Sequence, residues 1–263
     1  MLGHRTLKRV VRAIFRRRNY RALKNSLLKY ERPFDGLRRY LFQAGRYPVT
    51  MPIRTPLGVV RPVTYSHHDM LTVSEVFCRE DYECSEQIRT VVDIGSNIGI
   101  SALYFLTRNS EAFVYLFEPQ PVNCQKLLKN LEHFKGRYEF QPIAIALGDG
   151  EAEMGFEETG RYGGIGTGHE TKIRIPCREV GGVLRGIIEK RGEIDVLKID
   201  TETLEDEILA AIPGDLLRSI KQIFVEYNYG RNLLPLTHDY FQDGSIARFR
   251  RREDSFMRSP NTG

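Results

Sequence analysis

The stretch VVDIGSNIGIS, residues 91–101, joins an apolar run to a second apolar run through a turn rich in glycine. The first run has the character of a buried strand, and the second has that of a helix. The turn between them carries Asp93, Gly95, Asn97 and Gly99. Glycine at such positions lets the backbone approach a ligand where a side chain would collide. The spacing DxGxNxG departs from the GxGxxG pattern of dinucleotide-binding turns. Its Asp and Asn suit a ligand with an ammonium group and hydroxyls better than a phosphate.

Strand-like and helix-like segments alternate on both sides of this turn. Strands are expected in 88–95, 112–119, 137–149, 171–177, 194–200 and 219–229, and helices in 98–109, 120–134, 178–192 and 203–212. Strands that are apolar throughout and alternate with helices indicate a parallel sheet covered on both faces. The fold class predicted is therefore α/β, with a doubly wound, mostly parallel sheet. Ligands of such sheets bind beyond the carboxyl ends of the strands, where the strand order reverses.

The chain divides into four predicted regions: a basic helical N-terminal segment (1–50), a hairpin and helix leading into the core (51–87), the core itself (88–235) and a C-terminal tail (236–263). Pro-Leu-Gly between short β-prone runs predicts the hairpin over 54–63. A helix is expected over 71–82, with Ser74 as a candidate cap.

The second predicted core strand ends at Glu118, directly before Pro119. A carboxylate at that position can accept hydrogen bonds from both hydroxyls of a ribose, so a nucleoside ligand is expected. A second glycine-rich stretch, RYGGIGTGH at 161–169, opens no helix. We interpret it as a surface loop that serves either the structure or contact with a substrate.

The chain resembles the class I S-adenosylmethionine-dependent methyltransferases, and in particular the FkbM family. The resemblance lies in four motifs taken together: VVDIGSNIG, the following FEP, ALGD (146–149) and VLKIDTE (196–202). The resemblance covers roughly residues 53–228 and keeps the motifs in order. It implies that Asp93, Gly95, Asn97 and Gly99 hold the methionine portion of S-adenosylmethionine. It also implies that Glu118 holds the ribose, and that the segment from Ala146 to Asp149 lies near adenine. The family usually has KxDxEG at the last motif, and this chain has Thr203 in place of that glycine, which puts the shape of the substrate pocket in question.

Lys198 lies between apolar residues in what should be a central strand, where an unpaired ammonium is costly. Strand alternation places Lys198 and Asp200 on one side, and Asp200 and Glu202 at the carboxyl edge. These three are the candidate catalytic residues: Asp200 as the first choice of base, Glu202 as the second, and Lys198 to set their charge state. A divalent metal on Asp200 could act instead, by acidifying a bound hydroxyl. His169 and His238 are further candidates for the base, and an internal ion pair without catalytic function is the structural alternative.

The predicted activity is methyl transfer from S-adenosylmethionine to a hydroxyl of a sugar, glycolipid or secondary metabolite, the acceptor class following from the resemblance alone. The alternatives are a catalytically silent S-adenosylmethionine-binding or scaffold protein, an NAD-dependent oxidoreductase and a nucleic-acid methyltransferase. Absence of GxGxxG disfavours the oxidoreductase. The sequence DTET after the fourth strand, which lacks an NPPY-like turn, makes nucleic acid an unlikely partner.

The positive charge is concentrated at the N-terminus. Residues 1–40 hold thirteen Lys/Arg and two acidic residues, a net charge of +11, so the remainder carries −6 of the total of +5. Leu7, Val10, Val11, Ile14 and Phe15 recur at helical spacing among the arginines, which predicts a helix that either contacts anionic membrane or an acidic partner, or packs on the core. No apolar run reaches the roughly 18 residues of a membrane span, and the N-terminus lacks the features of a secretory signal. A cytoplasmic location, either free or peripheral to the membrane, is therefore expected, with the four cysteines as reduced and mostly buried thiols.

Overall fold

The computed structural model describes residues 17–156, 163–165 and 171–253. The chain divides into two compact units, with the boundary between Glu83 and Cys84. The predicted helix over Leu7 to Phe15 lies outside the described residues. So do His169 and most of the glycine-rich stretch 161–169.

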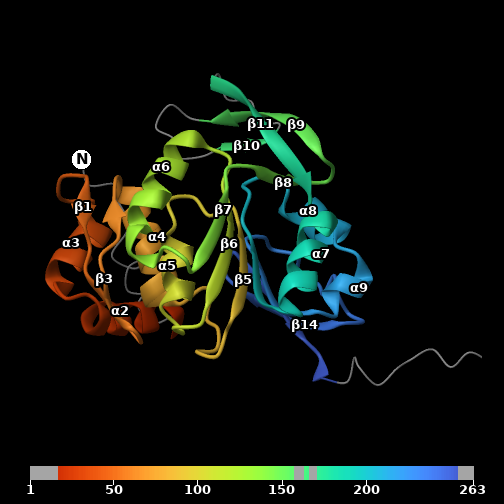
Figure 1. The fold of residues 1–263 in the computed structure, drawn as a ribbon. Helices are drawn as coiled ribbons and strands as arrows, with labels where there is room; N and C mark the ends of the chain where they lie inside the picture. The colour runs from red at the N-terminus through yellow and green to blue at the C-terminus, as the bar shows by residue number, and fades with distance from the viewer. Residues whose placement is uncertain (1–16, 157–162, 166–170, 254–263) are drawn as a thin grey trace, which may run out of the picture. The chain divides into compact units, whose positions relative to one another are not determined.

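The first unit contains α2 (Arg17–Lys29), α3 (Pro33–Phe42), α4 (His67–Val73) and a π-helical turn, η1 (Ser74–Arg79) (Figure 1). The predicted hairpin is confirmed as β2 (Ile53–Thr55) paired with β3 (Gly58–Val60), and β1 (Val49–Thr50) pairs with β4 (Val63–Thr64). The prediction of Ser74 as a helix cap is wrong. The cap is Ser66, which forms a capping box with Asp69, and Ser74 lies where α4 continues into η1. This reciprocal pair satisfies free backbone donors at the start of α4 and lengthens the helix toward its N-terminus.

The second unit is built on a seven-stranded sheet of order β14-β15-β13-β12-β5-β6-β7. Its strands are β5 (Thr90–Ile94), β6 (Phe113–Phe117), β7 (Tyr138–Gln141), β12 (Ile194–Ile199), β13 (Ile220–Val225), β14 (His238–Asp243) and β15 (Ile246–Arg251). All neighbours pair in parallel except β15, which is antiparallel to both β13 and β14. The predicted doubly wound, mostly parallel sheet is confirmed.

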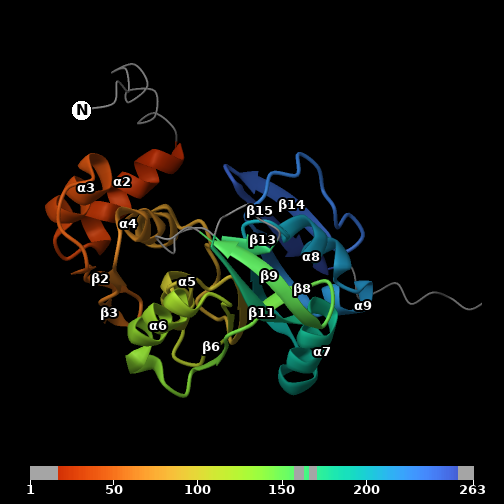
Figure 2. The ribbon, with the colours of Figure 1, turned by 90° about the horizontal axis from the view of Figure 1, so that it is seen from above.

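Helices cover both faces of this sheet, as Figures 1 and 2 show. One face carries α5 (Ile100–Leu106) and α6 (Pro121–Asn130), which is followed by the 3₁₀ turn η2 (Glu132–Phe134). The other carries α7 (Val180–Arg191), α8 (Glu205–Ala211) and α9 (Gly214–Leu217). A continuous apolar core fills the space between α7, α8, α9 and the central strands. Burial on both faces explains why these strands are apolar through their length.

The two halves of the sheet meet between β5 and β12, and the chain passes from one half to the other in the connection from β7 to β12. From β5 it winds outward to β6 and β7, and from β12 it winds the opposite way to β13. Asp195 joins the two halves at the amino ends of the strands, because its Oδ2 accepts the backbone N–H groups of Arg89 and Thr90 at 2.7 and 2.9 Å. Its Oδ1 lies 2.7 Å from Lys221 Nζ, at the start of β13.

Two parts of the second unit differ from the sequence prediction. The single strand expected over 137–149 is divided into β7 and β8 (Ala144–Ala146), and β8 belongs to a separate four-stranded sheet. This sheet has the order β10-β9-β11-β8, with β9 (Gly150–Phe156), β10 (Gly163–Ile165) and β11 (Thr171–Glu179). The range 236–263, expected to be a tail, contains β14 and β15, which extend the main sheet.

The four cysteines are free thiols, three of them buried and Cys84 partly so. Among the helices that the structure describes, none is long and apolar enough to cross a membrane.

Candidate active site

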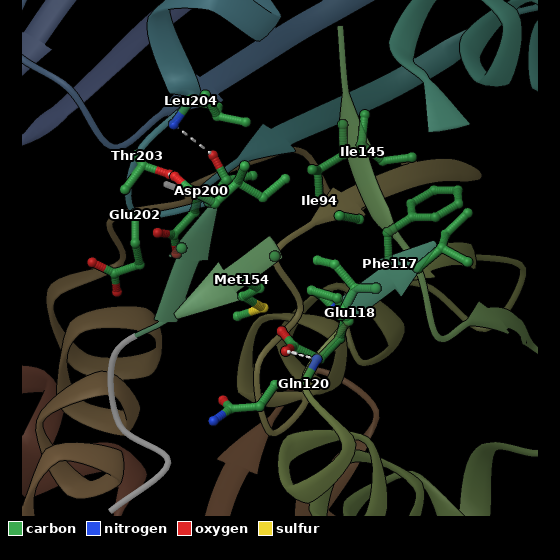
Figure 3. Close-up of a pocket in the computed structure, with 18 of the residues that line it drawn as sticks. Ile94, Phe117, Glu118, Gln120, Ile145, Met154, Asp200, Glu202, Thr203 and Leu204 are labelled. Carbon is green, nitrogen blue, oxygen red and sulfur yellow. Dashed lines mark hydrogen bonds between the residues drawn. The ribbon is translucent and has the colours of Figure 1, made fainter. Parts of the chain in front are cut away.

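A pocket lies at the carboxyl ends of β5, β6 and β12, where the strand order reverses (Figure 3). It encloses about 670 Å³ of empty space, part of which is open to solvent. The polar lining comes from the loops after these three strands, and the apolar lining comes largely from the small sheet: Ala144, Met154, Ile165 and Ile175.

The glycine turn after β5 is shaped by contact with the loop after β12. Gly95 has a φ of +78°, and a Cβ built on it would lie 1.7 Å from the carbonyl oxygen of Asp200. No side chain can be accommodated there, because real Cβ atoms do not approach backbone that closely. Gly95 therefore allows the two loops to meet, and both contribute to the pocket lining.

Glu118 is the central polar group on one side of the pocket. Its Oε2 accepts the backbone N–H of Asn97 at 2.8 Å, and its Oε1 accepts that of Gln120 at 2.9 Å. The carboxyl is only 5% exposed, and this burial raises its pKa to about 7. Each oxygen retains capacity for another hydrogen bond, since a carboxylate oxygen can accept more than one.

Gln120 was not predicted from the sequence, although it follows the FEP motif directly. It lines the pocket beside Glu118 and is 2% exposed. Its Oε1 accepts from Asn123 Nδ2 at 2.6 Å, while its Nε2 has no hydrogen-bond partner among the described residues. A buried amide donor without a partner is costly unless a ligand or water completes it. The Gln120 amide is therefore a candidate donor to a polar ligand or to a water.

A buried ion cluster supports the opposite side of the pocket. Lys198 Nζ lies 3.0 Å from Asp93 Oδ1, 3.2 Å from Asp200 Oδ2 and 2.9 Å from the carbonyl oxygen of Gly95. Burial alone would lower the pKa of Lys198, but the attraction of Asp200 and Asp93 outweighs it and raises the pKa above its usual value. The predicted pairing of Lys198 with Asp200 is present, and Asp93 is a second partner from the adjacent strand.

Asp93 and Gly99, predicted by resemblance to hold the cofactor, do not line the pocket. Asp93 is fully buried, and Ser101 Oγ donates to its Oδ2 at 2.5 Å. Gly99 has a φ of +84° and precedes α5, where an added Cβ would lie 3.3 Å from Leu127 Cγ of α6. In the protein alone, these two residues stabilise the turn and its packing. Their contact with a cofactor remains a prediction.

The segment expected near adenine also differs in detail from the prediction. Ile143, Ala144 and Ile145 line the pocket, whereas Ala146 and Asp149 do not. The Asp149 carboxylate is turned to the end of β11, where its Oδ1 accepts the backbone N–H of Glu179, the residue before α7, at 2.9 Å.

Glu202 and Thr203 lie on the side of the pocket opposite Glu118 and Gln120 (Figure 3). Glu202 is exposed and has a left-handed backbone with a φ of +71°. Its pKa is raised to about 7, mainly by partial desolvation and to a smaller extent by repulsion from Asp200 and Glu205. Thr203 is outside the left-handed region, so the backbone does not require the family's usual glycine there. Its Oγ1 donates to the Ile165 carbonyl at 3.2 Å and connects this loop to β10.

His238 is not placed to act as a base in this pocket. It is fully buried at the start of β14, with Nε2 3.1 Å from the carbonyl oxygen of Ile220 and Nδ1 2.9 Å from Thr237 Oγ1. Ile220 begins β13, so His238 lies at the amino edge of the sheet, away from the pocket. Burial lowers its pKa to about 4.

The donors and walls of the pocket fit S-adenosylmethionine. A carboxylate held by two backbone amides suits a ribose diol, the free amide of Gln120 suits a polar atom of the nucleoside, and apolar side chains from the small sheet suit a base. Within the part of the chain that the structure describes, no group of three or more His, Cys, Asp or Glu is arranged to hold a metal ion.

Sheet order, pocket position and lining together define a class I S-adenosylmethionine-dependent methyltransferase. The sequence pattern of the methyltransferase FkbM domain matches residues 93–244, more than half of the chain, and the chain belongs to this family.

Two further comparisons describe relatives. The AMB antimetabolite synthetase AmbE of Pseudomonas aeruginosa is 28% identical over 201 residues, which cover 61% of this chain and 9% of that protein. This chain thus spans only a small part of that relative's length. The crystal structure of a methyltransferase FkbM from Methylobacillus flagellatus is similar with a TM-score of 0.41 and 14% identity, over 70% of this chain and 54% of that one. An O-methyltransferase family protein from Burkholderia thailandensis has a TM-score of 0.39 and 13% identity, over 70% and 59% of the two chains.

Proposed function

We propose that this methyltransferase transfers the methyl group of S-adenosylmethionine to a hydroxyl oxygen of a sugar, glycolipid or secondary metabolite. The observation that carries the proposal is the position of Glu202 in the pocket lining, with no hydrogen bond or ion pair to another described residue. Desolvation and the neighbouring acids also raise its pKa to about 7. A hydroxyl must lose its proton when it is methylated, so it requires such an acceptor more than a neutral amine does. The relative AmbE is by name an antimetabolite synthetase, which agrees with a small-molecule product.

Glu118 and Gln120 would hold the nucleoside of the cofactor, and Asp200 and Asn97 would lie toward its methionine portion. When bound, the cofactor supplies an electrophilic methyl group on a sulfonium sulfur. The protein's part is to align the acceptor oxygen with that methyl group, an effect that can contribute roughly 7–11 kcal/mol to lowering the barrier.

Glu202 is a better candidate than Asp200 for the base. Asp200 Oδ2 is already engaged in an ion pair with Lys198 at 3.2 Å. Glu202 makes no hydrogen bond or ion pair with another described residue, and its pKa of about 7 lies near the operating pH, where a general base is most effective. In the proposed step, the acceptor oxygen would form a bond to the methyl carbon while the bond between that carbon and the sulfonium sulfur breaks. S-adenosylhomocysteine would be the leaving group, and Glu202 would receive the hydroxyl proton.

The experiment is a screen of hydroxylated sugars, glycolipids and small metabolites with isotopically labelled S-adenosylmethionine, followed by mass spectrometry of the product. With an accepted substrate, Glu202→Gln should lower kcat by about 10²–10⁴-fold and leave cofactor affinity unchanged. The wild-type rate should rise with pH through an apparent pKa near 7, and this rise should disappear in Glu202→Gln.

Asp200→Asn is the matched comparison, because it also removes one carboxylate charge from the pocket. Should Asp200→Asn abolish the pH dependence and Glu202→Gln retain it, the roles of the two residues would be reversed. Products methylated only on nitrogen or carbon would refute the proposed acceptor class.

A further inference from the structure

Helix α2 of the first unit presents its polar side to the protein. Asn25 Nδ2 donates to the Cys78 carbonyl at 2.8 Å, and Lys29 Nζ donates to the Phe77 carbonyl at 2.8 Å. These carbonyls belong to the last turn of η1, where backbone acceptors lack helical partners. Lys29 also pairs with Glu80 at 2.5 Å. Polar contacts therefore fix this side of α2 to η1.

The opposite side of α2 is apolar and faces solvent. Four apolar residues on this side are exposed, and we call them the α2 stripe: Tyr20 (64% exposed), Leu23 (40%), Leu27 (46%) and Leu28 (58%). Their spacing of three, four and one residues places them on one helical face. A helix of a soluble domain normally buries such a face and exposes the polar one. The reversed polarity indicates that the α2 stripe contacts something other than its own unit.

The next helix has the same pattern. Phe34, Leu41 and Phe42 of α3 are 83%, 61% and 68% exposed, at positions i, i+7 and i+8. In both helices a cation occupies position i+4 within the apolar face: Lys24 in α2 and Arg38 in α3. Exposed apolar side chains that gather on one face of a helix mark an interaction site more often than scattered single residues do.

The charge around these helices identifies the chemistry of the partner. Residues 17–50 carry nine Lys/Arg and two Asp/Glu, a net charge of +7. Exposed Lys24, Arg32 and Arg46 form no ion pair with the described residues. An apolar face interspersed with cations suits the boundary between lipid headgroups and acyl chains, where the apolar side chains enter the membrane and the cations contact anionic headgroups.

We propose that the α2 stripe, with the exposed face of α3, docks the protein on an anionic membrane surface. The side chains of the stripe insert at the headgroup boundary, and Lys24 contacts lipid phosphate. This docking is independent of the proposed acceptor.

The test is co-sedimentation of the full chain with vesicles of phosphatidylcholine alone or mixed with phosphatidylglycerol. The wild type should bind the anionic vesicles more tightly, with an affinity that falls as salt increases. Leu23→Ser combined with Leu27→Ser should weaken binding at least about tenfold, since two apolar side chains no longer enter the membrane. Lys24→Glu should weaken it roughly tenfold through charge alone.

The control is Leu128→Ser combined with Leu236→Ser, which removes two leucines of the second unit that are 45% and 88% exposed. This variant should bind like the wild type, and thermal unfolding should show that all variants fold.

Three results would overturn the proposal: failure of the wild type to bind anionic vesicles, equal losses in the stripe and control variants, or loss of binding only when residues 1–16 are deleted. A wild-type dimer that dissociates in the Leu23 and Leu27 variant, measured by analytical ultracentrifugation, would assign the stripe to a second copy of the chain instead.

Discussion

Replacing Lys198 by methionine tests the buried ion cluster beneath the pocket. Asp93 is fully buried, and its Oδ1 lies 3.0 Å from Lys198 Nζ. At an effective dielectric constant of about 20, that contact is worth about 5.5 kcal/mol of Coulomb energy. Lys198→Met leaves the Asp93 carboxylate buried with Ser101 as a neutral partner. Removing one partner of a buried pair costs about 3–5 kcal/mol, and we expect the free energy of unfolding to fall by that amount at pH 8.

The loss should depend on pH, because the variant's Asp93 becomes an unpaired buried acid. Its pKa in the folded state should rise above the unfolded value of about 3.9. Such a group stabilises the fold when it is protonated, and that stability is lost as pH rises through the folded pKa. Urea unfolding at pH 5 and pH 8 should therefore show a smaller deficit at pH 5.

The double variant Asp93→Asn with Lys198→Met removes the stranded charge and keeps an acceptor for Ser101. Its loss of stability should be smaller than the sum of the two single losses by at least about 1 kcal/mol. Additive losses together with a pH-independent deficit in Lys198→Met would refute the argument that an unpaired charge on Asp93 causes the destabilisation.

Two further predictions concern the cofactor pocket. Glu118 should be ionised to accept both ribose hydroxyls, and burial raises its pKa to about 7, so affinity for S-adenosylmethionine, measured by calorimetry, should rise between pH 6 and pH 8. Glu118→Gln should bind the cofactor at least about tenfold more weakly and without that pH dependence. An unchanged affinity would contradict the assignment of Glu118 to the ribose. Gly95→Ala would place a Cβ 1.7 Å from the Asp200 carbonyl oxygen and should abolish binding of S-adenosylmethionine. The control is Gly148→Ala, where an added Cβ meets nothing within 4 Å, and this variant should bind the cofactor normally. Equal affinities in the two variants would show that the close approach of the two loops is not needed for binding.

The main sheet could be predicted from the sequence because its central strands are buried on both faces. Their apolar runs, and the charged or glycine-rich turns that follow them, are visible without the structure. β14 and β15 were not predicted because they mix buried, partly buried and exposed residues and carry many charges, as in HDYFQD and IARFRR. In the small sheet, β11 was predicted as the strand over 171–177, whereas β9 and β10 were not predicted, because they adjoin the glycine-rich stretch 161–169.

The same limit applies within the site. Strand alternation predicted the contact of Lys198 with Asp200, because both lie on β12 and the loop that directly follows it. The contact with Asp93 depends on the register that aligns Lys198 of β12 with Asp93 of β5, which local sequence does not specify. The unpaired amide of Gln120 likewise follows from the position of Asn123 and the depth of burial. Gln120 could have been suggested only by its place after the FEP motif.

Charged side chains of β12 hold both ends of the neighbouring strand β5, at the boundary between the two halves of the main sheet. Asp195 binds the first backbone amides of β5, and Lys198 binds the Gly95 carbonyl beyond its last residue. Sliding of β5 along β12 would break both attachments together. Fluctuations that widen the pocket must therefore arise in the small sheet that carries Met154 and Ile175, and hydrogen exchange should be slowest along β5 and β12 and faster in β9 and β11.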